Sequence, residues 1–285
     1  MKGKFNKRQK MMKNMSALLA LAAGTLGLGM SEFGMMSVLS GAAADLNVSI
    51  PQAGHFVAAY ALGVCAGALL LIFIARGRPL KKTLLVLAAL MTAGNLLAAL
   101  SPDYAAMLAM RFVSGLPHGA FFGVGGIIAE KVAPPGRRTA AVSIMIAGMT
   151  VANLFGIPLG TAIAHAFSWR AMFALVAAWD LYPFYMVWRM VPEVPPLPDH
   201  GLKSQFAFLG RPAPWFLLGA IMLGNGGVFC WYSYINPLLV HVSGFAPSSM
   251  TYLMVVAGAG MVVGNLLAGE LAVAVRFRWR RLLSR

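Results

Sequence analysis

Residues 104–129 read YAAMLAMRFVSGLPHGAFFGVGGIIA, and this run indicates what kind of protein the sequence encodes. It is long enough to cross a bilayer as one helix, which takes about 20 apolar residues. Arg111 is the one charged side chain in it. Seven other apolar stretches of similar length occur along the chain, so we predict an all-α polytopic membrane protein. The eight predicted spans are 15–39, 54–75, 83–100, 104–129, 140–163, 170–188, 214–236 and 250–273.

The composition agrees with this interpretation. Of the 285 residues, 59% are hydrophobic and only 11% are charged, against about 25% charged in ordinary globular proteins. Such a balance argues against a secreted disulfide scaffold, a disordered tail and most soluble enzymes. The sequence contains no phosphate-binding loop and no cluster of residues with metal-ligand spacing. We therefore expect neither an enzyme nor a metal or organic cofactor.

The net charge of +15 is a topology signal. All lysines and arginines except Arg111 and Arg170 fall in the N-terminal segment, the C-terminal tail or alternate connections between spans. Basic residues accumulate on the cytoplasmic side of membrane proteins. The pattern predicts a multi-pass protein of a bacterial-type inner membrane with both termini in the cytoplasm. Its partner is then the lipid bilayer, and we expect no nucleic acid.

One proline-rich polar stretch divides the chain. Residues 189–213 contain five prolines, which cannot continue a helix, and they are predicted to be a cytoplasmic linker. The expected organisation is a basic N-terminus (1–14), a six-helix bundle (15–188), the linker (189–213), two helices of a second bundle (214–273) and a basic tail (274–285).

The two helices predicted after the linker repeat a pattern found in the first two helices of the chain. Gly63 and Gly67 are four residues apart in the second span, as are Gly260 and Gly264 in the eighth, and a proline precedes each pair at a similar distance. Small residues at this spacing let helices pack closely. The matching turn and orientation indicate a parallel internal repeat, which is common in transporters.

Several longer motifs resemble the major facilitator superfamily, in particular its AraJ-like sugar-efflux and drug–proton antiporter branch. They are GLGMSEFG at 27–34, YALG at 60–63, RFVSGLPHGAFFG at 111–123, GMTVANL at 148–154 with GIPLG at 156–160, SWRAMF at 168–173 and GNGGVF at 224–229. The resemblance extends from residue 15 to about residue 269. It implies a major facilitator fold with a six-helix N-terminal bundle and the first two helices of the C-terminal bundle.

The sequence departs from the family in three places. The family has twelve helices, whereas this chain has eight, and residues after Gly269 do not resemble a family loop; we therefore expect a C-terminal truncation. Ala75 stands where the family usually has an acidic residue before Arg76, which weakens the gating contact expected of Arg76 and Arg78 in this cytoplasmic loop. Ile157 separates Gly156 from Pro158 where the antiporter signature has them adjacent.

Two ionisable residues stand out within the spans. Glu32 and Arg111 each lie about seven residues from the outer end of a predicted helix, so they should share one depth and form a pair. A purely structural pair is one interpretation. The resemblance, which places both helices at the central cavity, favours proton coupling by Glu32 under the control of Arg111. His118 lies seven residues after Arg111, on the same helical face, and could extend the proton path.

Asp180 also lies inside a predicted span. The resemblance places that helix on the outside of the bundle, so we expect a pairing with a polar neighbour rather than a transport role.

Candidate substrate contacts concentrate in the seventh span. Asn225, Phe229, Tyr232 and Asn236 follow helical spacing, and Trp231 flanks them. Rings that cover apolar faces and amides that bind hydroxyls suit a sugar or a small amphipathic solute, although an interfacial aromatic belt has the same composition. Asn153 in the fifth span is a further candidate.

The function predicted from the sequence is secondary active transport. The chain would export an arabinose-like sugar or a small amphipathic compound in exchange for protons, by alternating access, with the proton gradient as its energy source. Two alternatives remain open at this point. The chain is a truncated membrane remnant that does not transport, or it is a partial carrier that needs a partner chain or a second copy of itself.

Overall fold

The computed structural model describes residues 2–75, 77–196, 201, 206–264 and 267. Within these residues, eight helical segments are long and apolar enough to cross a membrane. The prediction of an all-α polytopic fold is therefore confirmed. The segments are Met12–Ser37, Ile50–Leu71, Leu80–Ala99, Tyr104–Val132, Arg138–Ala166, Trp169–Met190, Pro212–Tyr232 and Pro247–Gly264.

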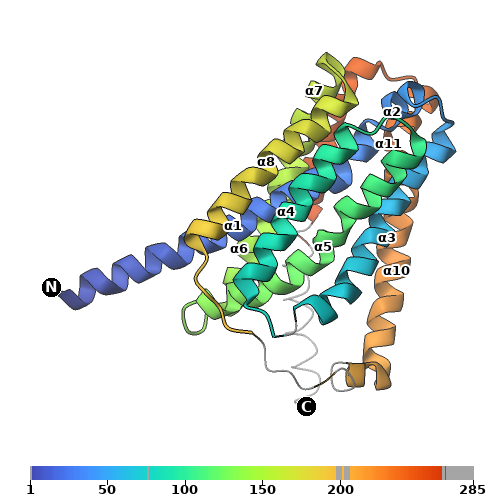
Figure 1. Ribbon diagram of the computed structural model, residues 1–285. Helices are drawn as coiled ribbons and strands as arrows, with labels where there is room; N and C mark the ends of the chain where they lie inside the picture. The colour runs from blue at the N-terminus through green and yellow to red at the C-terminus, as the bar shows by residue number, and fades with distance from the viewer. Residues whose placement is uncertain (1, 76, 197–200, 202–205, 265–266, 268–285) are drawn as a thin grey trace, which may run out of the picture.

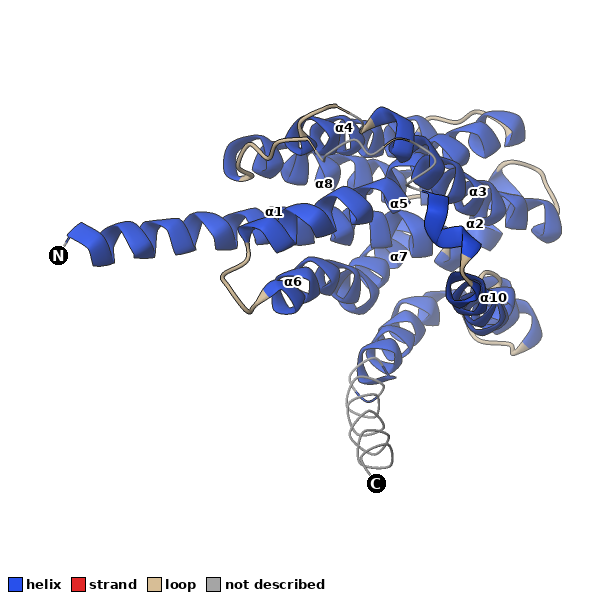
Figure 2. Ribbon diagram, turned by 90° about the horizontal axis from the view of Figure 1, so that it is seen from below, coloured by secondary structure: helices blue, strands red, loops and turns tan. Residues whose placement is uncertain are grey.

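The six N-terminal spans form one bundle around α1 (Lys2–Ser37), whose first residues project beyond the other helices (Figures 1 and 2). Helix α1 packs against α5 (Tyr104–Val132), α6 (Arg138–Val151) and α8 (Trp169–Met190). Helix α3 (Ile50–Ile74) packs against α5, and α4 (Leu80–Ala99) lies against both α5 and α8. This arrangement surrounds the Glu32 region of α1 with helices.

Local sequence signals explain where several helices begin. Ser49 caps α3 and forms a capping box with Gln52, and Asp103 caps α5 by accepting from the backbone N–H of Ala106 at 2.8 Å. Ser168 caps α8 in the same way. These side chains satisfy N–H groups that a helix leaves unpaired in its first turn. All three caps lie at the same end of the bundle, which fixes the ends of the spans there.

Glycines permit the close contact between α3 and α5. A Cβ atom on Gly63 would collide with the carbonyl oxygen of Phe112, and one on Gly67 with the carbonyl oxygen of Leu116. On the other helix, a Cβ on Gly115 would collide with the carbonyl oxygen of Tyr60. Because backbone atoms cannot move aside as a flexible side chain can, these positions require glycine for this helix pair to pack.

The fifth span is not one regular helix. A π-helical turn, η1 (Ala152–Gly156), joins α6 to α7 (Ile157–Ala166), and Pro158 lies in the first turn of α7. A π-turn of this kind is frequent at functional sites and re-aims the side chains it contains. It places Asn153 at the junction of the two helical segments.

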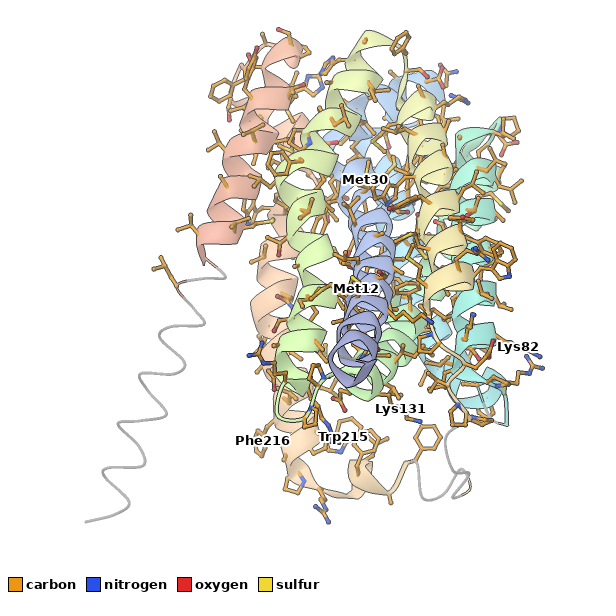
Figure 3. The ribbon with its side chains drawn as sticks, turned by 90° about the vertical axis from the view of Figure 1, so that its left-hand side faces the viewer. Met12, Met30, Lys82, Lys131, Trp215 and Phe216 are labelled. Atoms are coloured by element: carbon orange, nitrogen blue, oxygen red, sulfur yellow. The ribbon has the colours of Figure 1, made fainter. Side chains whose placement is uncertain are left out.

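The basic connections gather at one end of the bundle. Lys82 and Lys131 lie at this end, together with Trp215 and Phe216 at the start of α10 (Pro212–Tyr232) (Figure 3). We call it the basic end, and the opposite end the outer end. The short helix α2 (Leu39–Asp45) lies at the outer end, immediately after α1.

The seventh span differs from its prediction at its outer end. Helix α10 stops at Tyr232, and the chain continues through α11 (Ile235–Pro237), η3 (Leu238–Val242) and η4 (Pro247–Ser249) into the last span. Along α10 only Tyr232 is buried. The N-terminal bundle contacts this part through a cluster at the outer half. It comprises Met36, Ile157, Tyr232, Ile235, Met250 and Met254.

Candidate functional site

Four polar side chains from three helices meet inside the N-terminal bundle. Glu32 comes from α1, Tyr60 from α3, and Arg111 and His118 from α5. Arg111 and Tyr60 are buried, with 0% and 2% of their surfaces exposed, and His118 is 8% exposed. The Glu32 side chain keeps 21% of its surface accessible, so it is the member of the cluster most open to a mobile proton or solute.

His118 stands between Glu32 and Tyr60. Its Nδ1 lies 2.9 Å from the Tyr60 hydroxyl, and its Nε2 lies 3.8 Å from Oε2 of Glu32. The ring stacks on Phe122 at a centroid distance of 5.4 Å, which fixes its plane. An imidazole with one nitrogen on a hydroxyl and the other near a carboxylate can accept a proton on one side and release one on the other.

The predicted pairing of Glu32 with Arg111 takes the form of an electrostatic interaction rather than an ion pair at contact distance. Arg111 and Glu32 interact electrostatically, but within the described residues no ion pair joins them, and the base nearest Glu32 is His118. Nη1 of Arg111 donates instead to the carbonyl oxygen of Ser31 at 3.0 Å, and Nε to that of Phe56 at 3.3 Å. The prediction rested on the equal depth of Glu32 and Arg111 in their helices. Equal depth does not determine which basic side chain of α5 lies next to Glu32.

The guanidinium of Arg111 also lies between aromatic rings. Its carbon is 4.3 Å from the centroid of Tyr60 and 5.4 Å from that of Phe173. A cation over a ring face is stabilised by the ring quadrupole, more so where water is excluded. These contacts hold the charge of Arg111 in place beside Glu32 while leaving Nη2 without a hydrogen-bond partner.

The predicted substrate stripe is divided by the structure into two parts. Phe229 and Tyr232 pack against Phe33 of α1, at centroid distances of 5.9 and 5.8 Å. Asn225, one helical turn earlier, is exposed on α10, and Trp231 is half-exposed. The contact with α1 therefore involves only the outer part of the stripe.

Asn236 joins the two parts of the molecule at the outer end. Its Nδ2 donates to the carbonyl oxygen of Ser37 at 2.8 Å, and its Oδ1 accepts from the backbone N–H of Ser40 at 3.3 Å. Ser37 ends α1, and Ser40 lies in the first turn of α2, whose N-cap residue Val38 makes no side-chain cap. One amide therefore satisfies both a C-terminal carbonyl and an N-terminal N–H group.

The remaining candidates lie apart from these contacts. Asn153 is 8% exposed, and its buried Oδ1 has no hydrogen-bond partner. Arg78 is exposed in the loop after α3, at the basic end. Arg76 lies outside the described residues.

A cavity of about 570 Å³ lies at the outer end, beside Asn236. Its lining is mostly apolar, and the polar side chains in it are Ser37, Ser40, Ser49, His165, Asn236 and His241. The buried hydroxyl oxygen of Ser40 has no hydrogen-bond partner. The cavity is thus bounded by both parts of the molecule and lies on the outer side of the Asn236 contact.

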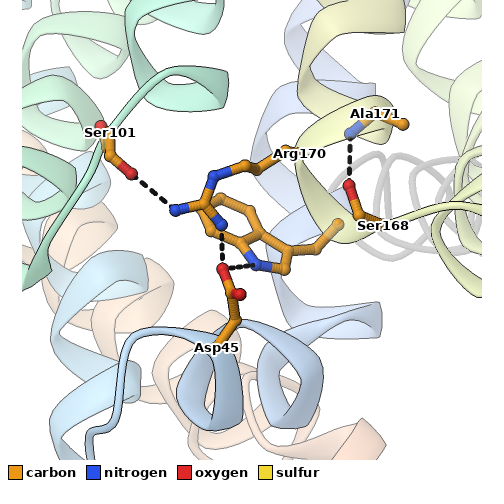
Figure 4. A network of polar contacts seen from close by, with 6 residues as sticks. Asp45, Ser101, Ser168, Arg170 and Ala171 are labelled. Carbon is orange, nitrogen blue, oxygen red and sulfur yellow. Dashed lines mark hydrogen bonds and ion pairs between the residues drawn. The ribbon is translucent and has the colours of Figure 1, made fainter.

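An ionic network fixes the outer ends of α2 and α8 (Figure 4). Arg170 forms an ion pair with Asp45 and donates to the carbonyl oxygen of Ser101, and the indole N–H of Trp169 donates to Asp45 at 3.0 Å. The hydrogen bond from Trp169, followed by that from Arg170, lowers the pKa of Asp45 below its ordinary value of 3.8. This network ties three connections together at the outer surface.

Sequence reasoning missed two residues with buried polar contacts: Tyr60, and Asn95, which hydrogen-bonds to Ser31 and Asp180. Tyr60 was visible only as part of a family motif, and nothing in its own spacing indicated that its hydroxyl meets His118. Asn95 carries an amide in the interior of a mostly apolar span, and an amide at this depth is a signal that could have identified it as part of a buried network.

Taken together, the spans and the intramembrane polar cluster define a polytopic helical membrane protein of the transporter type. The Major Facilitator Superfamily sequence profile matches residues 21–284. The chain belongs to this family. Its members named below are transporters, in agreement with the prediction that the chain is not an enzyme.

Curated relatives match most of the chain. It is 47% identical over 255 residues to the Escherichia coli protein named "Putative transporter AraJ", which covers 90% of this chain and 65% of that protein. It is 36% identical to the inner membrane transport protein YdhP of Escherichia coli, over 90% of this chain and 66% of that protein. A "Probable sugar efflux transporter" of Helicobacter acinonychis is 28% identical, over 84% of this chain and 61% of that protein. The chain thus spans about two thirds of the length of these relatives.

Solved structures show the same fold. A bacterial homologue of the human lysosomal transporter Spinster, in an inward-facing unoccupied conformation, superposes with a TM-score of 0.70 at 19% identity, over 90% of this chain and 63% of that one. A D-xylose–proton symporter gives a TM-score of 0.68 at 17% identity, over 91% of this chain and 69% of that one. At these identities the likeness concerns the fold.

Proposed function

We propose that the chain carries the proton-coupling half of a secondary transporter that exchanges a small solute for protons. The observation that carries this proposal is the contact between Glu32 and His118, inside the bundle and next to Arg111. An ionisable residue within a membrane costs at least about 2.5–3.5 kcal/mol on insertion scales, so a group of three needs a function or a strong structural reason. Partial access to Glu32 favours a function.

In the proposed cycle, Glu32 takes up a proton in one conformation and releases it in the other. The ionised carboxylate is stabilised by the charge of Arg111, and the protonated form loses this attraction. His118 passes the proton, since its two nitrogens face Glu32 and the Tyr60 hydroxyl. Arg111 cannot itself give up its proton under ordinary conditions, so it acts as a fixed charge that couples protonation to helix position.

The conformational part of the cycle is a rocking of the two parts of the molecule. Support comes from the location of several of their contacts: the Asn236 hydrogen bonds and the packing of Phe33 against Phe229 and Tyr232 lie toward the outer end. Opening the outer end requires these contacts to break. We therefore assign Asn236, which the sequence suggested as a substrate contact, to closure of the outer end.

The proposed solute is an arabinose-like sugar or a small amphipathic compound. Asn153 has an unpaired buried acceptor, and the exposed amide of Asn225 and the ring of Trp231 remain available on α10. Amides bind hydroxyl groups and rings cover the apolar faces of sugars. Relatives that carry the name of sugar efflux transporters support the same class.

The proposed location is the inner membrane of a bacterium, with both termini in the cytoplasm. The basic connections support this orientation because Lys82 and Lys131 lie at one end of the bundle (Figure 3). The bacterial relatives support the membrane. In this orientation Arg78, which belongs to the predicted gating loop, faces the cytoplasm.

The test is solute-dependent proton movement in proteoliposomes. The purified chain is reconstituted with an internal pH dye, and L-arabinose and D-xylose are added as probes; wild-type protein should move protons with either sugar, and Glu32→Gln should not. Glu130→Gln is the matched control, because Glu130 is exposed at the basic end of the same bundle. Equal proton movement by wild-type protein and Glu32→Gln would contradict the proposed role of Glu32.

A second candidate is a partial carrier completed by another chain or another copy. The supporting observation is the open space beside several glycines of the last two spans: nothing packs within 4 Å of a Cβ position on Gly219, Gly224, Gly260 or Gly264. Gly258 of the last span, in contrast, is in tight contact with the backbone of Asn153, as Gly63 and Gly67 are with α5. The mass of the purified protein in detergent, measured by light scattering, distinguishes a transporter that acts as a single chain from a partial carrier completed by another chain or copy. A single-chain mass together with sugar-dependent proton movement would exclude this candidate.

A further inference from the structure

A second row of buried polar groups leads away from Arg111 to the far side of the bundle. It runs from Arg111 on α5 through Ser31 on α1 and Asn95 on α4 to Asp180 on α8. None of the four is more than 1% exposed. Four polar residues from four helices, all excluded from solvent, form a continuous connection between the proposed coupling site and a carboxyl group outside it.

The hydrogen bonds of this row all have the same direction. Nη1 of Arg111 lies 3.5 Å from the Ser31 hydroxyl oxygen, toward which it donates, and that hydroxyl donates to Oδ1 of Asn95 at 2.7 Å. Nδ2 of Asn95 then donates to Oδ2 of Asp180 at 2.8 Å. Such a chain places a cation at its donor end and an acceptor at its other end, and aligned bonds of this kind reinforce one another. Oδ2 of Asp180 accepts at the far end of this row, and Oδ1 of the same carboxyl group is buried without a hydrogen-bond partner.

The packing makes room for the carboxyl group of Asp180. A Cβ atom on Gly27 of α1 would collide with Oδ1 of Asp180, so glycine at this position allows α8 to bring the carboxyl group against α1. Gly94, next to Asn95, similarly lies against the Cα of Ser114 on α5. Two glycines thus allow the helices to approach closely on both sides of the row.

Arg111 has a charge requirement that its direct contacts do not meet. Its hydrogen bonds go to two backbone oxygens and a hydroxyl, and within the described residues no carboxylate forms an ion pair with it. A buried cation without a counter-ion is strongly unfavourable. Glu32 can supply the opposite charge only while it is ionised, and the proposed function requires that it becomes neutral in each cycle.

We infer that Asp180 is a remote counter-ion of Arg111, connected through Asn95 and Ser31, and that it holds the guanidinium in position when Glu32 carries the proton. This inference rests on the proposed function for the statement that Glu32 changes its charge. It gives Asp180, for which the sequence suggested only a polar neighbour, a positioning role in transport.

The test is a double-variant cycle that does not depend on a solute. Glu32→Gln makes Glu32 permanently neutral, and Asp180→Asn removes the charge of Asp180 while keeping an oxygen that can accept from Asn95. The melting temperature of the purified protein is measured for wild type, both single variants and the double variant. We expect the loss in the double variant to exceed the sum of the single losses by about 3 °C or more, because Arg111 then has no counter-ion.

The matched control is Asp45→Asn in the same two backgrounds. Asp45 has its own partner, Arg170, at the outer surface. The decrease in melting temperature caused by Asp45→Asn should therefore simply add to the decrease caused by Glu32→Gln. Additive losses for Asp180→Asn as well would overturn the inference. If Asp180→Asn does not accumulate, Asn95→Ala breaks the same chain and should show the same excess with Glu32→Gln.

Failure of this inference is distinguishable from failure of the proposed function. Glu32→Gln protein that still moves protons with sugar would refute the coupling role of Glu32 whatever the melting temperatures are. If the melting losses are additive and Glu32→Gln no longer moves protons with sugar, the coupling role of Glu32 stands. The role of Asp180 as a counter-ion is then refuted. Asp180→Glu keeps the charge, so it should show no excess loss with Glu32→Gln; this result would separate a counter-ion from a residue that only packs.

Discussion

Replacement of Asn236 by leucine should open the outer end of the protein. Leucine has a similar volume but makes no hydrogen bonds, so the carbonyl of Ser37 and the N–H of Ser40 lose their shared partner. A buried polar group left unpaired costs about 1–3 kcal/mol. With about 1 kcal/mol for each of the two groups, the closed state loses about 2 kcal/mol, which corresponds to about a 30-fold change in the ratio of open to closed molecules.

Distances between spin labels measure this change directly. One label is attached to Ala105→Cys, at the outer start of α5, and the other to Ser243→Cys, after η3, so that the distance spans the two parts of the molecule. Both positions are exposed. The native Cys65 and Cys230 are replaced by serine. Asn236→Leu should increase the long-distance fraction relative to the unchanged background.

Asn225→Leu is the matched control for this experiment. It makes the same chemical change on the exposed part of α10, where the structure records no hydrogen bond to the N-terminal bundle, and it should leave the distances as they are. If Asn236→Leu also leaves the distance distribution unchanged, the amide does not hold the outer end closed, and the reasoning from its two hydrogen bonds is refuted.

Two further predictions concern packing and pH. Gly67→Ala should lower the melting temperature by an amount equivalent to about 1–3 kcal/mol, because the added methyl group meets the carbonyl oxygen of Leu116, which cannot move aside. Asp45→Asn should reduce stability near neutral pH but not in strong acid. Because the pKa of Asp45 is below 3.8 in the folded protein, its ionised form contributes stability above that pH, and the contribution is lost as the pH falls through the lower folded value. Melting curves from neutral pH into strong acid, below the lowered pKa of Asp45, compare the variant with wild type.

Each of these predictions has a clear contrary result. Gly126→Ala is the control for Gly67→Ala, since no atom lies within 4 Å of its Cβ position and alanine favours a helix. Equal losses for the two glycines would contradict the packing argument. A constant difference between wild type and Asp45→Asn down to acid pH would show that the charge of Asp45 does not stabilise the outer end.

The spans could be predicted from the sequence because the bilayer imposes a length and a composition on every helix. Residues 104–129 were recognisable from these two properties alone, and α5 indeed covers them. The exact ends depend on local chemistry instead. The seventh span was expected to continue to residue 236, but α10 ends at Tyr232, and the polar spacing through Asn236 continues across the break.

Contacts between helices were less predictable for a physical reason. Helical periodicity indicates which residues of one helix share a face, but it does not say which face of the neighbouring helix is opposite. Glu32 and Arg111 were correctly seen as unusual, and the proximity of His118 to Glu32 emerged only once α1 and α5 were placed together. The row from Asn95 to Asp180 depends in the same way on the packing of α4 against α8.

The most direct test of the central claim counts protons. Addition of L-arabinose to the purified protein in weakly buffered detergent solution should release protons from the wild-type chain and none from Glu32→Gln. Glu130→Gln should behave as wild type. Proton release that persists in Glu32→Gln would contradict the account of Glu32 as the coupling residue.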